Sequence, residues 1–377
     1  MKNIGVIAEY NPFHRGHEAQ LKALRARFGP DCALVVALGG CFTQRGEAAL
    51  FSKYARAEAA VRCGADLVLE LPLPWAASSA EGFSRGGVGV LNGLGNVEVL
   101  AFGSECADIR RLEKIAALTE AADFDALLRE QLGTGVGYAE ARQRALEALA
   151  GEPLPELRAR NDILAVEYLR ALRTQGSGME PLPLPRFGEY PPASELRRRG
   201  DFYGALPEAA AAVFRREEEA GRRVEPGALD APILAALRRM TDDELAALPG
   251  ASEGLERRLK RAALAAGTVE ELVSLAATKR YPAARLRRMA LAAFLGLPAG
   301  LEKTLPPYLR VLGLNERGAA VLHAASPRLP VITKPADGKG EIFELEARAC
   351  GLYTLAFPEP GQRRGDLDYT ATPFVMK

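Results

Sequence analysis

EYNPFHRGHEAQL, residues 9–21, lies between a short apolar run at residues 4–8 and the start of a helical pattern. Unpaired N–H groups and the positive dipole end at a helix N-terminus attract phosphate. His14 and His17 are three residues apart, so one helical face carries both, and Gly16 lets an anion approach the backbone closely. The segment therefore predicts a phosphate site. A metal-binding pair and two solvent-exposed histidines are the alternatives.

The first half of the chain alternates between two periodicities. Continuous apolar runs separated by helices predict a parallel sheet covered on both faces. Such sheets bind ligands beyond the carboxyl ends of their strands, so we expect His14, Gly39, Gly40 and Gly103 on one edge. The expected strands are residues 4–8, 33–38, 66–71 and 97–102, and the expected helices are residues 16–28, 53–63 and 76–94.

The second half shows a mainly helical pattern with few strand candidates. Helical patterns follow residue 109, then a proline-rich strand at 181–186 and a short basic helix from Ser194. From about residue 201 the sequence is mainly helical, with a strand candidate at 331–333. We expect an α/β protein with two domains: a Rossmann-like, ATP-binding catalytic domain at 1–200 and a mainly helical domain at 201–377.

The composition excludes several classes of protein. The 49 basic and 48 acidic residues nearly cancel, so the whole chain is not an obvious polyanion binder. No apolar run approaches the roughly 18 residues that a membrane helix needs. The five cysteines are scattered and form no CxxC pair, so neither structural zinc nor a disulfide framework is expected. We expect a cytoplasmic protein without a metal site of its own.

These motifs resemble a known family. HxGH after a first strand is similar to the signature of the nucleotidyltransferase superfamily, and IAEYNPFHRGH resembles the bacterial tRNA(Met) cytidine acetate ligases. The resemblance covers essentially the whole chain. It continues through GGCFTQRGEAALFSKYARAEAAVRCGADLVLELP (39–72), AFGSE (101–105), ARNDILAVEYL (159–169), ASELR (193–197), TKRYPAARLRR (278–288), PPYLRVLGLNERG and LPVITK.

The resemblance implies a two-step reaction. Acetate attacks the α-phosphate of ATP, which gives acetyl-adenylate and pyrophosphate, and the wobble cytidine of elongator tRNA(Met) then takes the acetyl group on N4. Mg²⁺ is expected to accompany ATP, and His14 and His17 are the expected catalytic residues. The ATP contacts that the resemblance implies are Ile7, Ala8, Glu9, Tyr10, Asn11, Pro12, Phe13, His14, Arg15, Gly16, His17, Glu18, Ala19, Gln20, Gly103, Asn161 and Arg186.

Further residues are candidates for anion contacts. Ser194 and Arg197 resemble the superfamily's second phosphate-binding turn, although Pro192 and Ala193 precede Ser194 where the family usually has small hydroxyl residues. Gln44, Arg45, Gly46 and Lys53 follow the second strand and are candidates for holding acetate or phosphate; a solvated loop is the alternative.

A basic segment points to RNA. Residues 255–290 are rich in Lys and Arg, and such clusters neutralise nucleic-acid backbones. A helix beginning near Pro282 would project several of these charges toward one side; a solvated helix face is the alternative. The expected RNA-binding residues are Lys279, Arg280, Arg285, Arg287 and Arg288.

Two other functions share some of these features. An enzyme that adenylylates a small cofactor precursor would share the HxGH site, but it would not need the long basic part after residue 200. A non-catalytic RNA-binding protein with a relict nucleotide fold would not need intact His14, Gly16 and His17.

Overall fold

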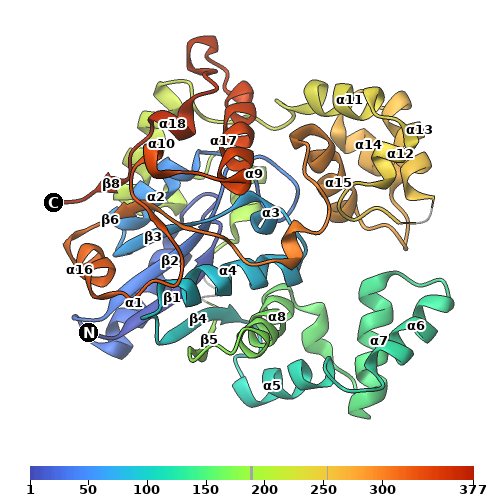
Figure 1. Cartoon of the computed structure of the whole chain (residues 1–377), viewed down its shortest axis with the longest axis horizontal. Helices are drawn as coiled ribbons and strands as arrows, with labels where there is room; N and C mark the ends of the chain where they lie inside the picture. The colour runs from blue at the N-terminus through green and yellow to red at the C-terminus, as the bar shows by residue number, and fades with distance from the viewer. Residues whose placement is uncertain (187–189, 253) are drawn as a thin grey trace.

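A central, mostly parallel sheet organises the chain (Figure 1). The computed structural model describes residues 1–186, 190–252 and 254–377. The strand order is β5-β4-β1-β2-β3-β6-β7, and β8 pairs with β6. The strands are β1 (Asn3–Ala8), β2 (Ala33–Gly39), β3 (Leu67–Leu71), β4 (Val99–Ser104), β5 (Glu180–Pro185), β6 (Leu309–Leu314), β7 (Val331–Ile332) and β8 (Phe374–Val375).

The prediction of a parallel α/β sheet is confirmed. Strands β1 to β5 pair in parallel, with Ile4 opposite Leu34 on one side and Val99 on the other. Strand β6 was not predicted, and it runs antiparallel to β3. It belongs to a proline-punctuated part of the sequence, where no local pattern says which sheet edge a short apolar run will join.

Helices cover both faces of the sheet. Helices α1, α2 and α10 (Glu208–Glu219) pack on one face, and α4, α5 and α8 pack on the other. The helix predicted over residues 76–94 is interrupted, since Ser79 caps a new helix start. The helices up to residue 200 are α1 (Arg15–Phe28), α2 (Lys53–Arg62), α3 (Leu73–Ala76), α4 (Ala80–Leu94), α5 (Ile109–Leu118), α6 (Phe124–Gly133), α7 (Tyr138–Ala150), α8 (Arg160–Thr174) and α9 (Ala193–Arg199).

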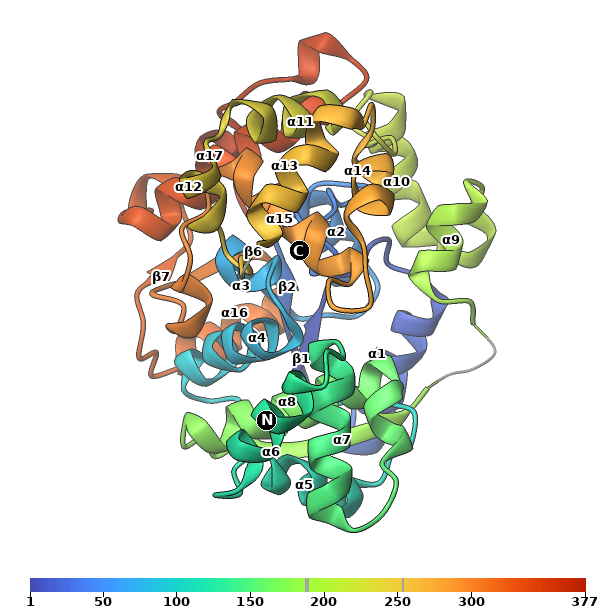
Figure 2. The ribbon, with the colours of Figure 1, turned by 90° about the vertical axis from the view of Figure 1, so that its right-hand side faces the viewer.

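The helices after residue 200 include a group that packs on a third apolar cluster, with residues such as Leu237, Leu259 and Leu286, which also takes in Phe42 and Leu73 from the first half of the chain. Figure 2 shows this group, α11 to α15, above the helices α5 to α8. No helix in the described ranges is long and apolar enough to cross a membrane. The helices are α10 (Glu208–Glu219), α11 (Asp230–Arg239), α12 (Asp242–Ala246), α13 (Leu255–Ala265), α14 (Val269–Ala276), α15 (Ala283–Leu295), α16 (Glu316–Ala324), α17 (Glu341–Tyr353) and α18 (Leu367–Thr370).

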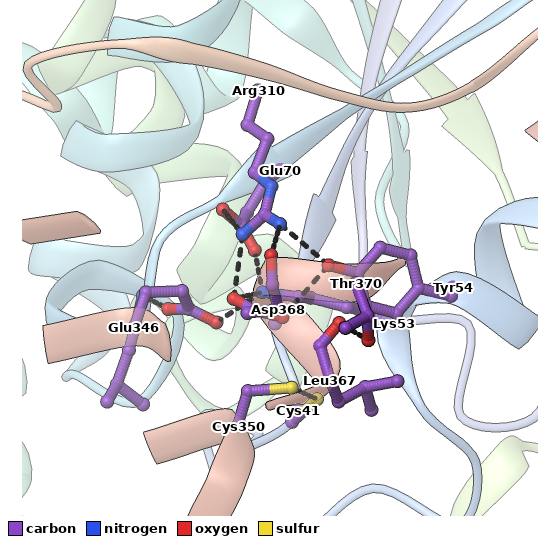
Figure 3. A network of polar contacts seen from close by, with 12 residues as sticks. Cys41, Lys53, Tyr54, Glu70, Arg310, Glu346, Cys350, Leu367, Asp368 and Thr370 are labelled. Carbon is purple, nitrogen blue, oxygen red and sulfur yellow. Dashed lines mark hydrogen bonds and ion pairs between the residues drawn. The ribbon is translucent and has the colours of Figure 1, made fainter. Parts of the chain in front are cut away.

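A buried ionic cluster ties the end of the chain to the sheet (Figure 3). Lys53 is fully buried and its Nζ donates to Glu70, to Glu346 at 3.0 Å and to Asp368 at 2.7 Å. Arg310 on β6 donates to Asp368 at 2.7 Å. Burial lowers the pKa of Lys53, but the three carboxylates outweigh it and hold that pKa well above its usual value. Lys53 therefore stabilises the junction of α2, β3, α17 and α18.

This arrangement bears on two predictions from the sequence. Lys53 was a candidate for holding acetate or phosphate at the sheet edge, and that interpretation is wrong because its ammonium group is enclosed by carboxylates. The domain boundary near residue 200 stays a prediction. Strands β6 to β8 follow it and join the same sheet as β1 to β5.

Candidate active site

The two histidines of the HxGH motif build the N-terminal cap of α1. The Gly16 N–H donates to His14 Nδ1 at 3.0 Å, and the His14 N–H donates to His17 Nδ1 at 3.3 Å. The rings stack with centroids 3.7 Å apart. Because Nδ1 accepts a hydrogen bond in both rings, the proton of each neutral imidazole lies on Nε2.

Both imidazoles are neutral near pH 7. Burial, together with the charge of Arg186, lowers the pKa of His14 to about 4. Burial and the neighbouring His14 hold the pKa of His17 well below its usual value. The motif therefore offers two Nε2–H donors beside the N-terminus of α1, where phosphate is favoured.

The turn between β1 and α1 is strained. Tyr10 has a φ of 46°, in the left-handed region that a bulky residue seldom adopts. Its ring packs against Phe13 and His17, with centroids 4.8 Å apart in each pair. The strained turn thus contributes directly to the packing that fixes the His17 ring.

A cleft of about 330 Å³ opens at the carboxyl ends of β1, β4 and β5. His14, Gly16, His17 and Gln20 line it from α1, and Gly103 lines it from the end of β4. This is the sheet edge at which the sequence predicts ligand binding. Other predicted ATP contacts that line it are Ile7, Ala8, Glu9, Tyr10, Asn11, Asn161, Arg186 and Arg197.

Arg56 holds the ends of two strands at this edge, and sequence reasoning missed it. It is fully buried, and its guanidinium donates to the carbonyl oxygens of Glu9, Gly40 and Phe51. Glu9 follows β1 and Gly40 follows β2, so one side chain fixes both strand ends. An arginine within the apolar run of α2 was the available signal.

Hydrogen bonds also organise the other side of the cleft. Asn161 Nδ2 donates to Glu105 Oε1 at 3.1 Å, and the Arg186 guanidinium lies 3.9 Å from the same oxygen. The buried Asp162 carboxylate accepts from the N–H groups of Glu105 and Cys106. Glu105 and Asp162 thereby position two of the predicted ATP contacts.

Comparisons with known proteins show the family to which the chain belongs. The family model described as HIGH Nucleotidyl Transferase matches residues 1–368. Curated proteins named tRNA(Met) cytidine acetate ligase match over full length: that of Acetivibrio thermocellus is 33% identical with 100% of both chains covered, and that of Syntrophomonas wolfei is 33% identical with 99% of both covered. The chain belongs to this ligase family. Among solved structures, Thermotoga maritima TmcAL bound with alpha-thio ATP is 31% identical with a TM-score of 0.93, covering 100% of this chain and 99% of that one.

Not every residue that the resemblance to the ligase family implies as an ATP contact reaches the cleft. Phe13 is fully buried in the apolar core, Arg15 is exposed, and Glu18 pairs with Lys22 at 2.8 Å. The described lining of the cleft does not include Pro12, Phe13, Arg15, Glu18, Ala19 and Ser194, and whether these residues contact ATP stays a prediction. A helix presents only one side to a ligand, so Gly16, His17 and Gln20 of α1 line the cleft while Arg15 and Glu18 do not.

The basic segment forms a helix where the sequence predicts one, since α15 follows Pro282. Its arginines do not share one face. Arg285 and Arg288 line one cavity, whereas Arg287 lines another and pairs with Glu270 and, at 3.8 Å, with Glu47. Lys279 and Arg280 precede the helix and are exposed.

Proposed function

We propose that this protein activates acetate with ATP and transfers the acetyl group to the wobble cytidine of elongator tRNA(Met), forming N4-acetylcytidine. The neutral His14–His17 pair at the N-terminus of α1 is the observation that carries the proposal, because it is built to donate hydrogen bonds to a phosphate. The names of the full-length relatives support the acetate and tRNA substrates. A tRNA substrate places the reaction in the cytoplasm.

The first step forms acetyl-adenylate. An acetate oxygen attacks the α-phosphorus of ATP, and the bond from that phosphorus to the β-phosphate oxygen breaks to release pyrophosphate. His14 and His17 donate from Nε2 to oxygens on which charge develops, and they are already oriented by their Nδ1 hydrogen bonds. Arg186 and Arg197 line the same cleft and supply permanent positive charge. Ser194 does not line it, so the proposal omits Ser194.

In the second step the N4 amine of cytidine attacks the acetyl carbonyl. A tetrahedral intermediate forms, the bond between the acetyl carbon and the phosphate oxygen breaks, AMP leaves with that oxygen, and the nitrogen loses a proton. The reaction needs the acceptor base beside the ATP cleft.

Mg²⁺ would occupy this cleft mainly through its bonds to the ATP phosphates. Glu9 is the acidic side chain that lines the described part of the cleft, and its Oε1 accepts from the Gln44 N–H at 2.7 Å. With one carboxylate at hand, the ion would be held by Glu9, phosphate oxygens and water, as is usual for Mg²⁺ with nucleotides. It would help neutralise the pyrophosphate. The buried carboxylates of Glu70, Glu346 and Asp368 lie within 4.8 Å of one another, but Lys53 already serves them as the cation.

RNA binding is proposed for the positively charged groups at the start of α15. Lys279, Arg280, Arg285 and Arg288 remain in the proposal. Arg287 does not, because its guanidinium is already paired with two carboxylates.

ATP–pyrophosphate exchange, measured with and without acetate, tests the first step. Acetate-dependent exchange is expected. Exchange that needs a different acceptor would favour an enzyme that adenylylates a small cofactor precursor, and no exchange would favour a relict RNA-binding protein. Mass spectrometry of elongator tRNA(Met) incubated with protein, ATP and labelled acetate tests the second step. An unlabelled wobble cytidine would refute the proposed transfer.

A further inference from the structure

A second cavity lies next to the ATP cleft, and three of the arginines proposed above to bind RNA line it. Its volume is about 450 Å³, and it lies between α15, the start of α7 and the start of α4. Arg280, Arg285 and Arg288 line it, together with Tyr138, Ser79 and Glu302. We call this cavity the arginine groove.

Two of the arginines that line the groove, Arg285 and Arg288, have no carboxylate partner among the described residues. Arg288 is half-buried, and its guanidinium donates to the Gln44 carbonyl at 3.1 Å. Arg285 donates to the Gly250 carbonyl and to Ser252 Oγ. In the described part of the chain, neither guanidinium has an ion pair with a carboxylate, and the Glu302 carboxylate accepts from Gly300 N–H instead. Burial, and then the charge of Arg285, lowers the pKa of Arg288 to about 10.

Helix geometry adds to this charge. Ser79 caps the N-terminus of α4, Tyr138 is the first residue of α7, and Pro282 precedes the first residue of α15. Each of these helix starts contributes residues to the groove. Helix N-termini carry partial positive charge. Three helix starts line the same cavity as two arginines that have no carboxylate partner among the described residues, and this favours an anion there.

An aromatic ring stands beside this charge. Tyr138 is 52% exposed although it is a large apolar side chain at the wall of a cavity. An exposed ring that lines the same cavity as guanidinium groups is a combination suited to single-stranded nucleic acid, in which bases stack and phosphates pair with cations. A site for a small free anion would not need the ring.

The groove adjoins the site of chemistry. The Gln44 carbonyl accepts a hydrogen bond from Arg288, which lines the groove, and Gln44 itself also lines the ATP cleft. Gly46 packs so tightly on the backbone of Arg287 and Arg288 that a Cβ there would overlap it. One loop therefore separates the two cavities, and a nucleotide in the groove lies close to a neighbour in the cleft.

We propose that the arginine groove binds one nucleotide of the acceptor RNA next to the modified cytidine, with Arg285 and Arg288 on its phosphate and Tyr138 stacked on its base. The inference rests on the proposed function, because it takes RNA as the substrate. It adds the place at which the strand is held and a residue, Tyr138, that lies outside the basic segment.

The test compares variants of the full-length protein in binding to an RNA hairpin across a salt series. Tyr138→Leu is expected to weaken binding by roughly 5- to 150-fold, the usual range for loss of one stacked base. Tyr138→Phe keeps the ring and is expected to retain wild-type affinity. Arg285→Gln is expected to lower the salt slope by roughly 0.7–0.9, as for one lost phosphate contact. Arg287→Gln is the matched control on the same helix and is expected to change neither quantity.

Several results would overturn the inference. One is unchanged RNA affinity in both Tyr138→Leu and Arg285→Gln. Because the Tyr138 side chain is exposed, Tyr138→Leu is expected to fold, so its RNA affinity reports on the groove and not on stability. Another is tight binding of inorganic phosphate, measured by calorimetry, that Arg285→Gln abolishes without affecting RNA, which would assign the groove to a free anion. Acetylation of tRNA by the wild-type protein is measured in parallel. If it occurs while the variants bind RNA normally, only the groove assignment fails; if it does not occur, the proposed function fails.

Discussion

The His14 side chain combines two roles that substitution can separate. Its Nδ1 caps α1 by accepting from the Gly16 N–H at 3.0 Å, while its Nε2–H is the proposed phosphate donor. The oxygen of Asn can replace Nδ1 but leaves no donor at the Nε2 position, whereas the amide nitrogen of Gln reaches that position and leaves no cap. His14→Asn is therefore expected to fold normally and to lose about 10²- to 10³-fold in kcat, the usual cost of one transition-state donor.

His14→Gln is expected to show the opposite pattern. Loss of the cap costs about 1 kcal/mol of unfolding free energy, while part of the exchange activity remains. The assay is acetate-dependent ATP–pyrophosphate exchange, with kcat and the KM for ATP measured separately and stability followed by urea denaturation. If His14→Asn keeps near wild-type kcat, the imidazole acts only as a cap and the proposed role of its Nε2–H is refuted.

Three further predictions concern stability. The pKa of His14 is lowered to about 4, so below pH 6.5 the unfolded chain binds a proton at this residue that the folded chain does not bind. Between pH 8 and 5.5 this difference should lower the unfolding free energy by about 1.4 kcal/mol. Urea denaturation of His14→Asn should lack this contribution to the pH dependence. An undiminished pH dependence in that variant would assign the effect to other groups. Lys53→Met should cost about 3–5 kcal/mol in the same assay, because three buried carboxylates lose their shared cation, and a loss below about 1 kcal/mol would contradict that account. A chain that ends at Gly200 lacks β6, Glu346 and Asp368 and should not fold cooperatively, as circular dichroism during thermal unfolding would show; a cooperative transition would instead support an independent first domain.

Local patterns in the sequence predicted many of the strands and helices. Four apolar runs became β1 to β4, and the helix pattern after Gly16 became α1. These elements could be predicted because strand and helix periodicity, and the capping ability of His14, depend on residues close together in the chain. The resemblance extended this to a ligase family, which the comparisons confirm.

Long-range contacts decided the rest. No local signal says that the run Leu309–Leu314 will pair antiparallel with β3, or that Lys53 will be enclosed by carboxylates from β3, α17 and α18. The same holds for the arginines of α15: within the described residues Arg287 pairs with Glu270 and Arg285 pairs with no carboxylate, although the two stand two residues apart. The sequence by itself determined the strand and helix segments of the sheet and the helix start at the HxGH motif, because these depend on neighbouring residues. Only the tertiary structure decided which charges are neutralised and which face a cavity, because that depends on groups brought together from distant parts of the chain.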